Sequence, residues 1–310
     1  MADPIVSILI VTWKRIDLLE ECLHAIAAAR PDVPFELVIV NNGGARTAAR
    51  VDALCAGARV VHSRVNLGLP GGLQLARSMA RGKYLATLQD DVVVHAGWLD
   101  RLVERMEDDP WVGIVGSSVE VPGGFIAGLY LLGGLTWLHP PADANPVPVD
   151  LCTSASMLIR ARAWDDAGGP SPELFPLGYV DFDLCIRVAR CGWIVETLGT
   201  SLVRHKWHGS TSPALRAYTV ERNARPLREW HAAWLAERPE EATLEEMRRR
   251  LVDRAAAIRA NPPPPGKDPK PLTRCDLTRL ERIARRGALR LRFERFCSML
   301  RRDDASKVSR

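Results

Sequence analysis

Four clusters of polar residues and glycines lie where predicted strands end in the first hundred residues of this 310-residue chain. One of them contains the adjacent carboxylates Asp90 and Asp91 after an apolar run. Such carboxylates repel each other and lose hydration, and a divalent cation beside them would offset both effects. The alternative is a solvated loop in which one Asp caps the following helix. The clusters are Thr12-Trp13-Lys14-Arg15, Asn41-Asn42-Gly43-Gly44, Asn66-Leu67-Gly68-Leu69-Pro70-Gly71-Gly72 and Gln89-Asp90-Asp91.

The segments that would position these clusters alternate between strand and helix patterns. Continuous Val, Ile and Leu runs are typical of parallel strands buried on both faces, whereas apolar residues at helical spacing indicate helices packed on the sheet. This order predicts a doubly wound α/β sheet that binds ligands where its strands' carboxyl ends open. The expected strands are 5–11, 35–40, 59–62 and 84–88, and the expected helices are 17–29, 45–56 and 71–81.

The second half of the chain changes character near residue 212, where we place a domain boundary between residues 1–212 and 213–310. Before it we expect helices at 98–106, 161–167 and 181–190, and strands at 112–116, 151–159 and 193–197, around a Gly-, Pro- and aromatic-rich stretch at 122–148. After it come charged helices at 213–237 and 243–260, a Pro-rich break at 262–265, and a basic helix at 276–302 that Gly287 should interrupt.

Seven segments between residues 5 and 225, in order along the chain, resemble those of family 2 glycosyltransferases, which are inverting enzymes with the GT-A fold. Residues 66–72 are similar to the Asn-Leu-Gly-x-x-Gly-Gly segment of the rhamnosyl- and galactofuranosyltransferase branch, and Gln89-Asp90-Asp91 occupies the place of the metal-binding Asp-x-Asp motif. The segments are 6–15, 36–43, 66–72, 89–91, 180–187, 205–210 and 221–223. The resemblance implies a GT-A catalytic domain followed by a C-terminal helical extension.

An inverting transfer is a single in-line displacement that needs a base on the acceptor hydroxyl and a cation on the departing diphosphate. The resemblance assigns the base to Asp181 with support from Asp183, and the ligands of Mn²⁺ or Mg²⁺ to Asp91 and His205. Asp181 could instead be a helix N-cap, and His205 a packing residue. The donor nucleotide would be bound by Thr12, Arg15, Asn41, Asn66, Gly68, Gly72, Gln89 and Asp90, with Asp90 on the ribose hydroxyls.

Three residues depart from the family pattern. Gln89 and Asn41 replace acidic residues, and Val180 stands where Glu is frequent. The Asn41 amide still accepts from a pyrimidine N3–H, so UDP- or dTDP-sugars remain the favoured donors, without the charge-assisted bond. These departures leave two hypotheses: a glycosyltransferase acting on a hydroxyl acceptor (glycan, lipid-linked glycan or metabolite), or a GT-A module that binds nucleotide without turnover.

Other classes fit the sequence poorly. A dinucleotide-dependent dehydrogenase would carry Gly-x-Gly-x-x-Gly after its first strand, where this chain has Thr12-Trp13-Lys14-Arg15. The net charge of +5 comes from residues 267–310, with fourteen Lys and Arg against six Asp and Glu, so we expect no nucleic-acid partner. The seven cysteines show no Cys-x-x-Cys pair, which argues against a zinc site.

The basic tail and the aromatic stretch each leave two interpretations open. The helix at 276–302 could lie on anionic lipid at the inner face of the membrane, or pack on the catalytic domain or on a twofold partner in a homodimer. Residues 125–138, with Trp137, could contact a sugar or a lipid, or form a buried flap. The resemblance implies that the acceptor side is formed by residues 152–156 and the variable stretch before them. The chain shows no secretory signal or apolar run of about 18 residues, so we expect a cytoplasmic protein.

Overall fold

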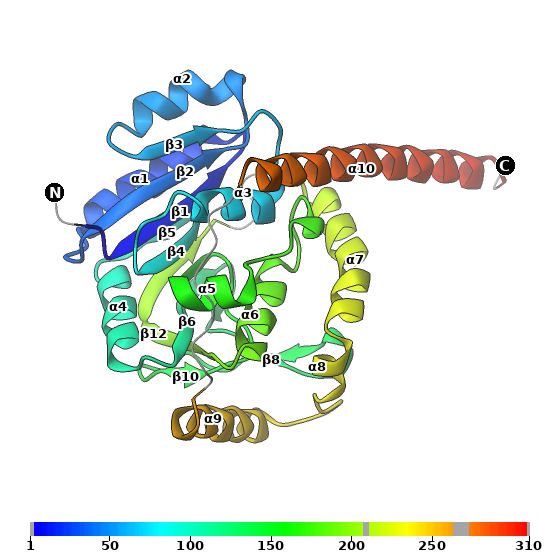
Figure 1. The fold of residues 1–310 in the computed structure, drawn as a ribbon. Coiled ribbons are helices and arrows are strands. Elements are labelled where there is room, and N and C mark those ends of the chain that lie inside the picture. Colours follow the sequence, from blue (N-terminus) through cyan, green and yellow to red (C-terminus); the bar gives the residue numbers. More distant parts are fainter. Residues whose placement is uncertain (1–2, 207–210, 263–272, 309–310) are drawn as a thin grey trace.

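The computed structural model describes residues 3–206, 211–262 and 273–308, with side chains in the last helix as far as Arg292. Its centre is a ten-stranded mixed sheet with helices on both faces (Figure 1). The predicted α/β class, with helices after the last strand, is confirmed. The proposed division at residue 212 stays a prediction. Residues 263–265 of the predicted Pro-rich break lie outside the described residues.

The strands follow the order β10-β12-β6-β11-β4-β1-β2-β3, with β5 paired to β12 and β7 to β6. β1 pairs in parallel with β2 and β4, and β2 with β3, whereas β11 runs antiparallel between β4 and β6. The strands of this sheet are β1 (Val6–Thr12), β2 (Phe35–Asn41), β3 (Arg59–His62), β4 (Tyr84–Gln89), β5 (Val92–Val94), β6 (Val112–Val121), β7 (Gly124–Ile126), β10 (Val147–Pro148), β11 (Ser156–Arg160) and β12 (Ile194–His205).

The position of β1 between two buried layers explains why its sequence is continuously apolar. Its side chains alternate between two buried layers, as the pleat of a strand requires. Ile8 and Ile10 pack with α1 (Ile16–Ala29) and α4 (Trp98–Asp108), while Leu9 faces the layer that contains α3 (Gly68–Arg77) and α6 (Val180–Arg190). All three side chains are fully buried. β1 is therefore covered on both faces, and its carboxyl end is the part that opens toward a ligand.

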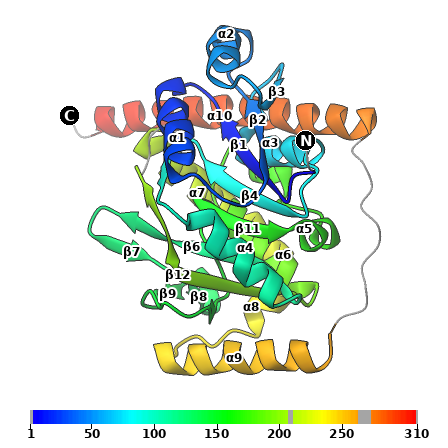
Figure 2. The ribbon, with the colours of Figure 1, turned by 90° about the vertical axis from the view of Figure 1, so that its left-hand side faces the viewer.

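The remaining helices and short elements complete the two faces. They are α2 (Ala45–Leu54), α5 (Ala161–Ala167), α7 (Pro213–Trp230), α8 (Ala232–Ala236), α9 (Leu244–Ala260) and α10 (Arg274–Val308), the 3₁₀ turns η1 (Gly133–Leu135) and η2 (Pro172–Leu174), and a separate pair of strands, β8 (Tyr130–Leu131) and β9 (Trp137–Leu138). In Figures 1 and 2, α9 lies at the bottom of the molecule, and α10 runs across its upper part at the level of α3.

Several boundaries differ from the sequence predictions. The helix expected at 71–81 begins at Gly68, where the backbone takes a φ of +69° that a residue with a side chain rarely adopts. The strand expected at 151–159 begins only at Ser156, and the strand expected at 193–197 continues to His205. The helix expected at 213–237 is divided at His231, which leaves helical geometry and places its Nε2 2.8 Å from an Asp183 carboxylate oxygen.

Gly287 does not interrupt the last helix, so that prediction is wrong. α10 continues through Gly287, and a Cβ atom added there would lie 2.6 Å from Cδ1 of Phe175. The glycine therefore gives close packing against the segment after η2. Leu280, Ala284 and Leu291 are also buried, and α10 contacts α3 and η2. Of the two interpretations of the tail, this structure has the helix packed on the α/β core.

None of the helices within the described ranges combines the length and the apolar character that a bilayer span requires.

Candidate active site

A cavity of about 900 Å³ lies at the carboxyl ends of β1 and β4, within the size range of small-molecule sites. It is lined by the loops that follow these strands, by the start of α6, and by one face each of α7 and α10. The predicted site residues that line it are Thr12, Asn66, Gly68, Gln89, Asp90, Asp91, Asp181 and His205. The structure thus brings together residues that lie far apart in the chain.

Asp91 and His205 form a buried pair on one side of this cavity. β5 and β12 run antiparallel with Val92 opposite His205, which places the residue before Val92 next to the imidazole. Nε2 of His205 lies 3.1 Å from Oδ1 of Asp91, and each side chain is less than a tenth exposed. The backbone N–H of Lys206 donates to the Asp91 carbonyl at 3.0 Å, which joins the two segments a second time.

Asp90 and Thr12 present polar atoms that the protein does not satisfy. Oδ2 of Asp90 and Oγ1 of Thr12 are buried and have no hydrogen-bond partner among the described residues. Burial raises the pKa of the Asp90 carboxyl to about 7, the nearby Thr12 hydroxyl opposes part of this rise, and the neighbouring Asp91 carboxylate adds to it. Buried polar atoms are normally paired, so these two indicate a place for ligand hydroxyls or a cation.

The donor set around Asp91 fits a divalent cation that a substrate helps to hold. No group of three or more His, Cys, Asp and Glu side chains suited to a metal occurs within the described ranges. Mg²⁺ and similar divalent cations, however, are commonly held by one or two protein groups together with substrate phosphates. Asp91 and His205, with the unsatisfied Asp90 oxygen beside them, supply such an incomplete set. Imidazole and carboxylate together suit Mn²⁺.

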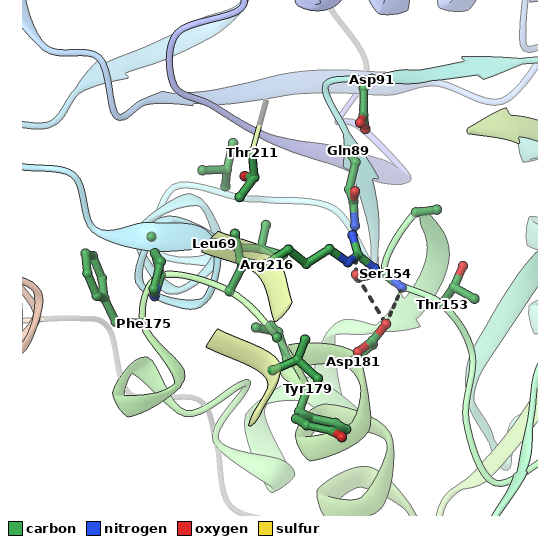
Figure 3. A pocket seen from close by; sticks show the side chains of 18 of the residues that line it. Leu69, Gln89, Asp91, Thr153, Ser154, Phe175, Tyr179, Asp181, Thr211 and Arg216 are labelled. Atoms are coloured by element: carbon green, nitrogen blue, oxygen red, sulfur yellow. Dashed lines mark hydrogen bonds between the residues drawn. The ribbon is translucent and has the colours of Figure 1, made fainter. Parts of the chain in front are cut away.

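Asp181 lies across the cavity from Asp91, with Gln89, Ser154 and Arg216 between them (Figure 3). Its Oδ2 accepts from the backbone N–H of Ser154 at 3.2 Å and from the Ser154 hydroxyl at 3.4 Å. Burial raises the pKa of the Asp181 carboxyl, while donors from Ser154 and Phe182 and the charge of Arg216 oppose part of the rise. A partly desolvated carboxylate at a cavity wall has the character of a general base.

The helix-cap interpretation of Asp181 does not describe this geometry. The N-cap of α6 is Tyr179, which has a left-handed backbone with a φ of 61° and makes no side-chain capping bond. Asp181 lies within the first turn of the helix, where its Oδ1 accepts from the N–H of Phe182 at 3.1 Å. Its second oxygen is directed to Ser154 instead.

Asp183 lies outside the cavity and is fully buried. Its carboxylate accepts from Ser171 N–H at 2.7 Å, lies 2.8 Å from Nε2 of His231, and pairs with Nε of Arg187 at 2.8 Å. Burial by itself would raise the pKa of Asp183, but these partners hold it below its ordinary value. Any support of Asp181 by this residue would therefore act through α6.

Three residues that we expected on the nucleotide have other contacts. Oδ1 of Asn41 accepts from the N–H of Gly43 and from the hydroxyl of Thr47, both at 2.8 Å, so this amide holds its own turn. Gly72 lets α3 approach β1, and Arg15 pairs with Asp17 at the surface. None of the three lines the cavity, whereas Asn42 does.

The sequence analysis did not identify Arg216, and it identified only Trp137 of an aromatic cluster. Arg216 lines the cavity from the start of α7, a charged helix whose sequence gives no sign of it. The Trp137 ring lies 5.5 Å from that of Phe182, which lies 5.0 Å from Tyr179. Trp137 is 39% exposed and Phe125 58%, so the buried flap does not describe these two side chains. His208 lies outside the described residues.

Comparison with known sequences gives a family over part of the chain. The sequence model of Glycosyl transferase family 2 matches residues 7–128. The chain is 26% identical over 210 residues to the uncharacterized protein y4gI of Sinorhizobium fredii, of which it spans 23%. It is 20% identical over 237 residues to an uncharacterized glycosyltransferase of Haemophilus influenzae, covering 71% of this chain and 70% of that protein.

Solved structures share the fold. GalNAc-T7, solved with UDP, GalNAc and Mn²⁺, matches 82% of this chain and 55% of its own with a TM-score of 0.61 and 15% identity. The mannosyltransferase PcManGT of Pyrobaculum calidifontis, solved with GDP-Man and Mn²⁺, matches 95% of this chain and 88% of its own, with a TM-score of 0.53 and 15% identity. The match to Glycosyl transferase family 2 therefore covers residues 7–128, and the described residues adopt the GT-A fold.

Proposed function

We propose that this protein is a metal-dependent inverting glycosyltransferase that moves a sugar from a nucleotide-diphosphate donor, a UDP- or dTDP-sugar, to a hydroxyl acceptor. The observation that carries the proposal is the single cavity that has the Asp91–His205 pair on one wall and the Asp181 carboxylate on another. Two carboxylates in different environments suit two different roles in one displacement. The rhamnosyl- and galactofuranosyltransferase branch remains our proposal for the nearest group.

The reaction would proceed at the anomeric carbon between these walls. The bond from that carbon to the donor phosphate oxygen breaks as the bond to the acceptor oxygen forms, with inversion, and the nucleoside diphosphate leaves. Asp181 takes the acceptor hydroxyl proton, which its raised pKa favours. Thr12 and Asp90 offer unsatisfied oxygens to the donor, and the Trp137–Phe182–Tyr179 ring cluster offers an apolar face to the acceptor.

Asp91 and His205 are the residues that would hold Mn²⁺ or Mg²⁺. A bound cation neutralises charge that develops on the departing diphosphate. Arg216 lines the cavity from α7, between Asp91 and Asp181, where its positive charge favours anions.

Donor hydrolysis and thermal shift test this function. We expect UDP or dTDP with Mn²⁺ to raise the melting temperature, and Asp181→Asn to lower donor turnover by at least about a hundredfold while nucleotide binding survives. Asp52→Asn, at an exposed pair on α2, is the matched control and should keep full turnover. Unchanged turnover in Asp181→Asn would reject Asp181 as the base.

A nucleotide-binding module without turnover is the second candidate. One observation favours it: the Gln89 amide is directed to Ser154 and adds no negative charge at the Asp91–His205 pair. This hypothesis predicts that nucleotide diphosphates bind with Mn²⁺ while wild type hydrolyses no donor and transfers no sugar. Measurable wild-type donor hydrolysis, lost in Asp181→Asn, would exclude it.

A further inference from the structure

Gln89 stands where the family motif has an acidic residue, but its side chain is directed away from the Asp91–His205 pair. Nε2 of Gln89 donates to the Ser154 hydroxyl oxygen at 2.8 Å. Its backbone N–H donates to the carbonyl of Ala155 at 3.2 Å, so the end of β4 is fastened twice to the segment before β11. The amide therefore has a defined partner on the Asp181 side of the cavity (Figure 3).

Ser154 continues this chain of hydrogen bonds. Its hydroxyl donates to Oδ2 of Asp181 at 3.4 Å while its own oxygen accepts from Gln89, and its backbone N–H donates to the same carboxylate oxygen at 3.2 Å. Ser154 is buried, so few alternative partners compete for its proton. A hydroxyl that accepts one hydrogen bond becomes a better donor in the next.

We propose that Gln89 is a positioning residue for the base: by donating to Ser154, it orients the hydroxyl that holds the Asp181 carboxylate toward the cavity. This inference rests on the proposed function, because it gives Asp181 the role of base. In place of a charge at the metal, the amide supplies a relay of two hydrogen bonds that ends on the opposite wall of the cavity.

Two other groups act on the same carboxylate and belong in its pH dependence. The Arg216 guanidinium, from α7, favours the ionised form of Asp181. The Tyr179 phenol, from the N-cap of α6, is neutral near pH 7, and its pKa is raised by burial and by the Asp181 charge. Neither group lies on the Gln89–Ser154 path, so a change made at Gln89 leaves both in place.

The test follows the titration of the Asp181 carboxyl directly, by carbon-13 NMR of the full chain. Removing the hydroxyl in Ser154→Ala should raise the midpoint of the Asp181 titration by about one pH unit. At a pH below the midpoint, the ionised fraction of Asp181 then falls about tenfold. Gln89→Leu should raise the Asp181 midpoint by a smaller amount. In a protein that already carries Ser154→Ala, Gln89→Leu should cause no further rise, because both changes break the same relay. Ser154→Thr, which keeps a hydroxyl, should restore the wild-type midpoint.

Thr153→Val is the matched control, since the Thr153 hydroxyl lines the same cavity and has no hydrogen-bond partner among the described residues. Its Asp181 midpoint should equal that of wild type. An unmoved midpoint in Gln89→Leu, or fully additive shifts in the double variant, would overturn the relay. Should Gln89→Leu fail to fold by its melting curve, Gln89→Met replaces it, because the unbranched Met side chain is neutral and has no N–H to donate to Ser154.

Gln89→Asp separates this inference from a metal-ligand role. The relay predicts that this variant moves the acid limb of kcat/KM to higher pH and lowers kcat about tenfold, with the half-saturating Mn²⁺ concentration unchanged. A lower half-saturating Mn²⁺ concentration with an unmoved acid limb would instead overturn it. If the titrations follow the relay but wild type turns over no donor, the proposed function fails, and the catalytic part of this inference fails with it.

Discussion

The Asp181 carboxylate is subject to opposing influences whose balance sets its proton affinity. Burial raises its pKa above the ordinary value, while donors from Ser154 and Phe182 and the Arg216 charge lower it. A base acts only when ionised, so kcat/KM should fall as the pH drops through this raised pKa. The acid limb of the profile should therefore lie above pH 3.8, the ordinary value for Asp.

Arg216→Gln tests this balance at the residue scale. The Arg216 charge opposes the rise in the Asp181 pKa that burial causes, so removing the guanidinium should raise this pKa further. The acid limb should then move to higher pH by about half a unit to one unit. The profile of kcat/KM from pH 4 to 9 measures it, and Arg286→Gln, on the exposed side of α10, is the control. A limb that stays in place or moves to lower pH would contradict the assignment.

At the scale of elements, Asp183 joins α6 to the junction of α7 and α8 and to the turn before η2. Its pKa is held low by His231, Arg187 and Ser171 against the effect of burial. A carboxyl whose folded-state pKa is depressed contributes stability above its unfolded pKa, and this contribution is lost as the pH falls through the folded value. The loss should therefore appear in acid, below about pH 3.8.

Asp183→Asn should destabilise the fold by about 3–5 kcal/mol near neutral pH, because it leaves the buried His231 and the Arg187 guanidinium without their carboxylate. Urea unfolding at pH 7 and at pH 3 measures the difference, which should shrink in acid. Asp52→Asn removes an exposed carboxylate paired to His62 and should cost less than about 1 kcal/mol. Equal costs for both variants would contradict the structural role of Asp183.

The elements that position the site were largely predictable, because their signals are local. Strand β1 and the acidic pair after β4 follow from apolar runs and their ends. The contacts of Gln89 and Asn41 could not be predicted, since an amide can serve several partners and the sequence does not fix its direction. Gly287 was misjudged for a related reason: a glycine in a helix weakens it locally, and only the approach of Phe175 explains its use.

At the scale of the whole molecule, α10 closes one wall of the cavity. Ala288, Leu291 and Arg292 line the cavity together with residues from β1, β4 and α6, and Gly287 packs on Phe175, which is itself part of the lining. The cavity is therefore built from both the α/β core and the last helix. A change on α10 far from the carboxylates should affect binding.

Gly287→Val tests this dependence. A side chain there meets Phe175, with the first added carbon 2.6 Å from its ring, so the variant should lose about 1–3 kcal/mol of stability or displace α10. We expect a lower melting temperature and weaker binding of nucleoside diphosphate by calorimetry. Arg286→Ala, on the preceding exposed residue, should change neither. Wild-type affinity and melting in Gly287→Val would show that α10 does not support the wall.

The order in which the ribosome makes the protein gives this arrangement a consequence. Asp91, Asp181 and His205 are translated well before Ala288, Leu291 and Arg292, which complete the lining. A nascent or prematurely terminated polypeptide can thus carry all of its proposed reactive groups yet lack the surface that encloses them. Such a fragment should bind nucleoside diphosphate more weakly than the full chain, because part of the cavity wall is missing.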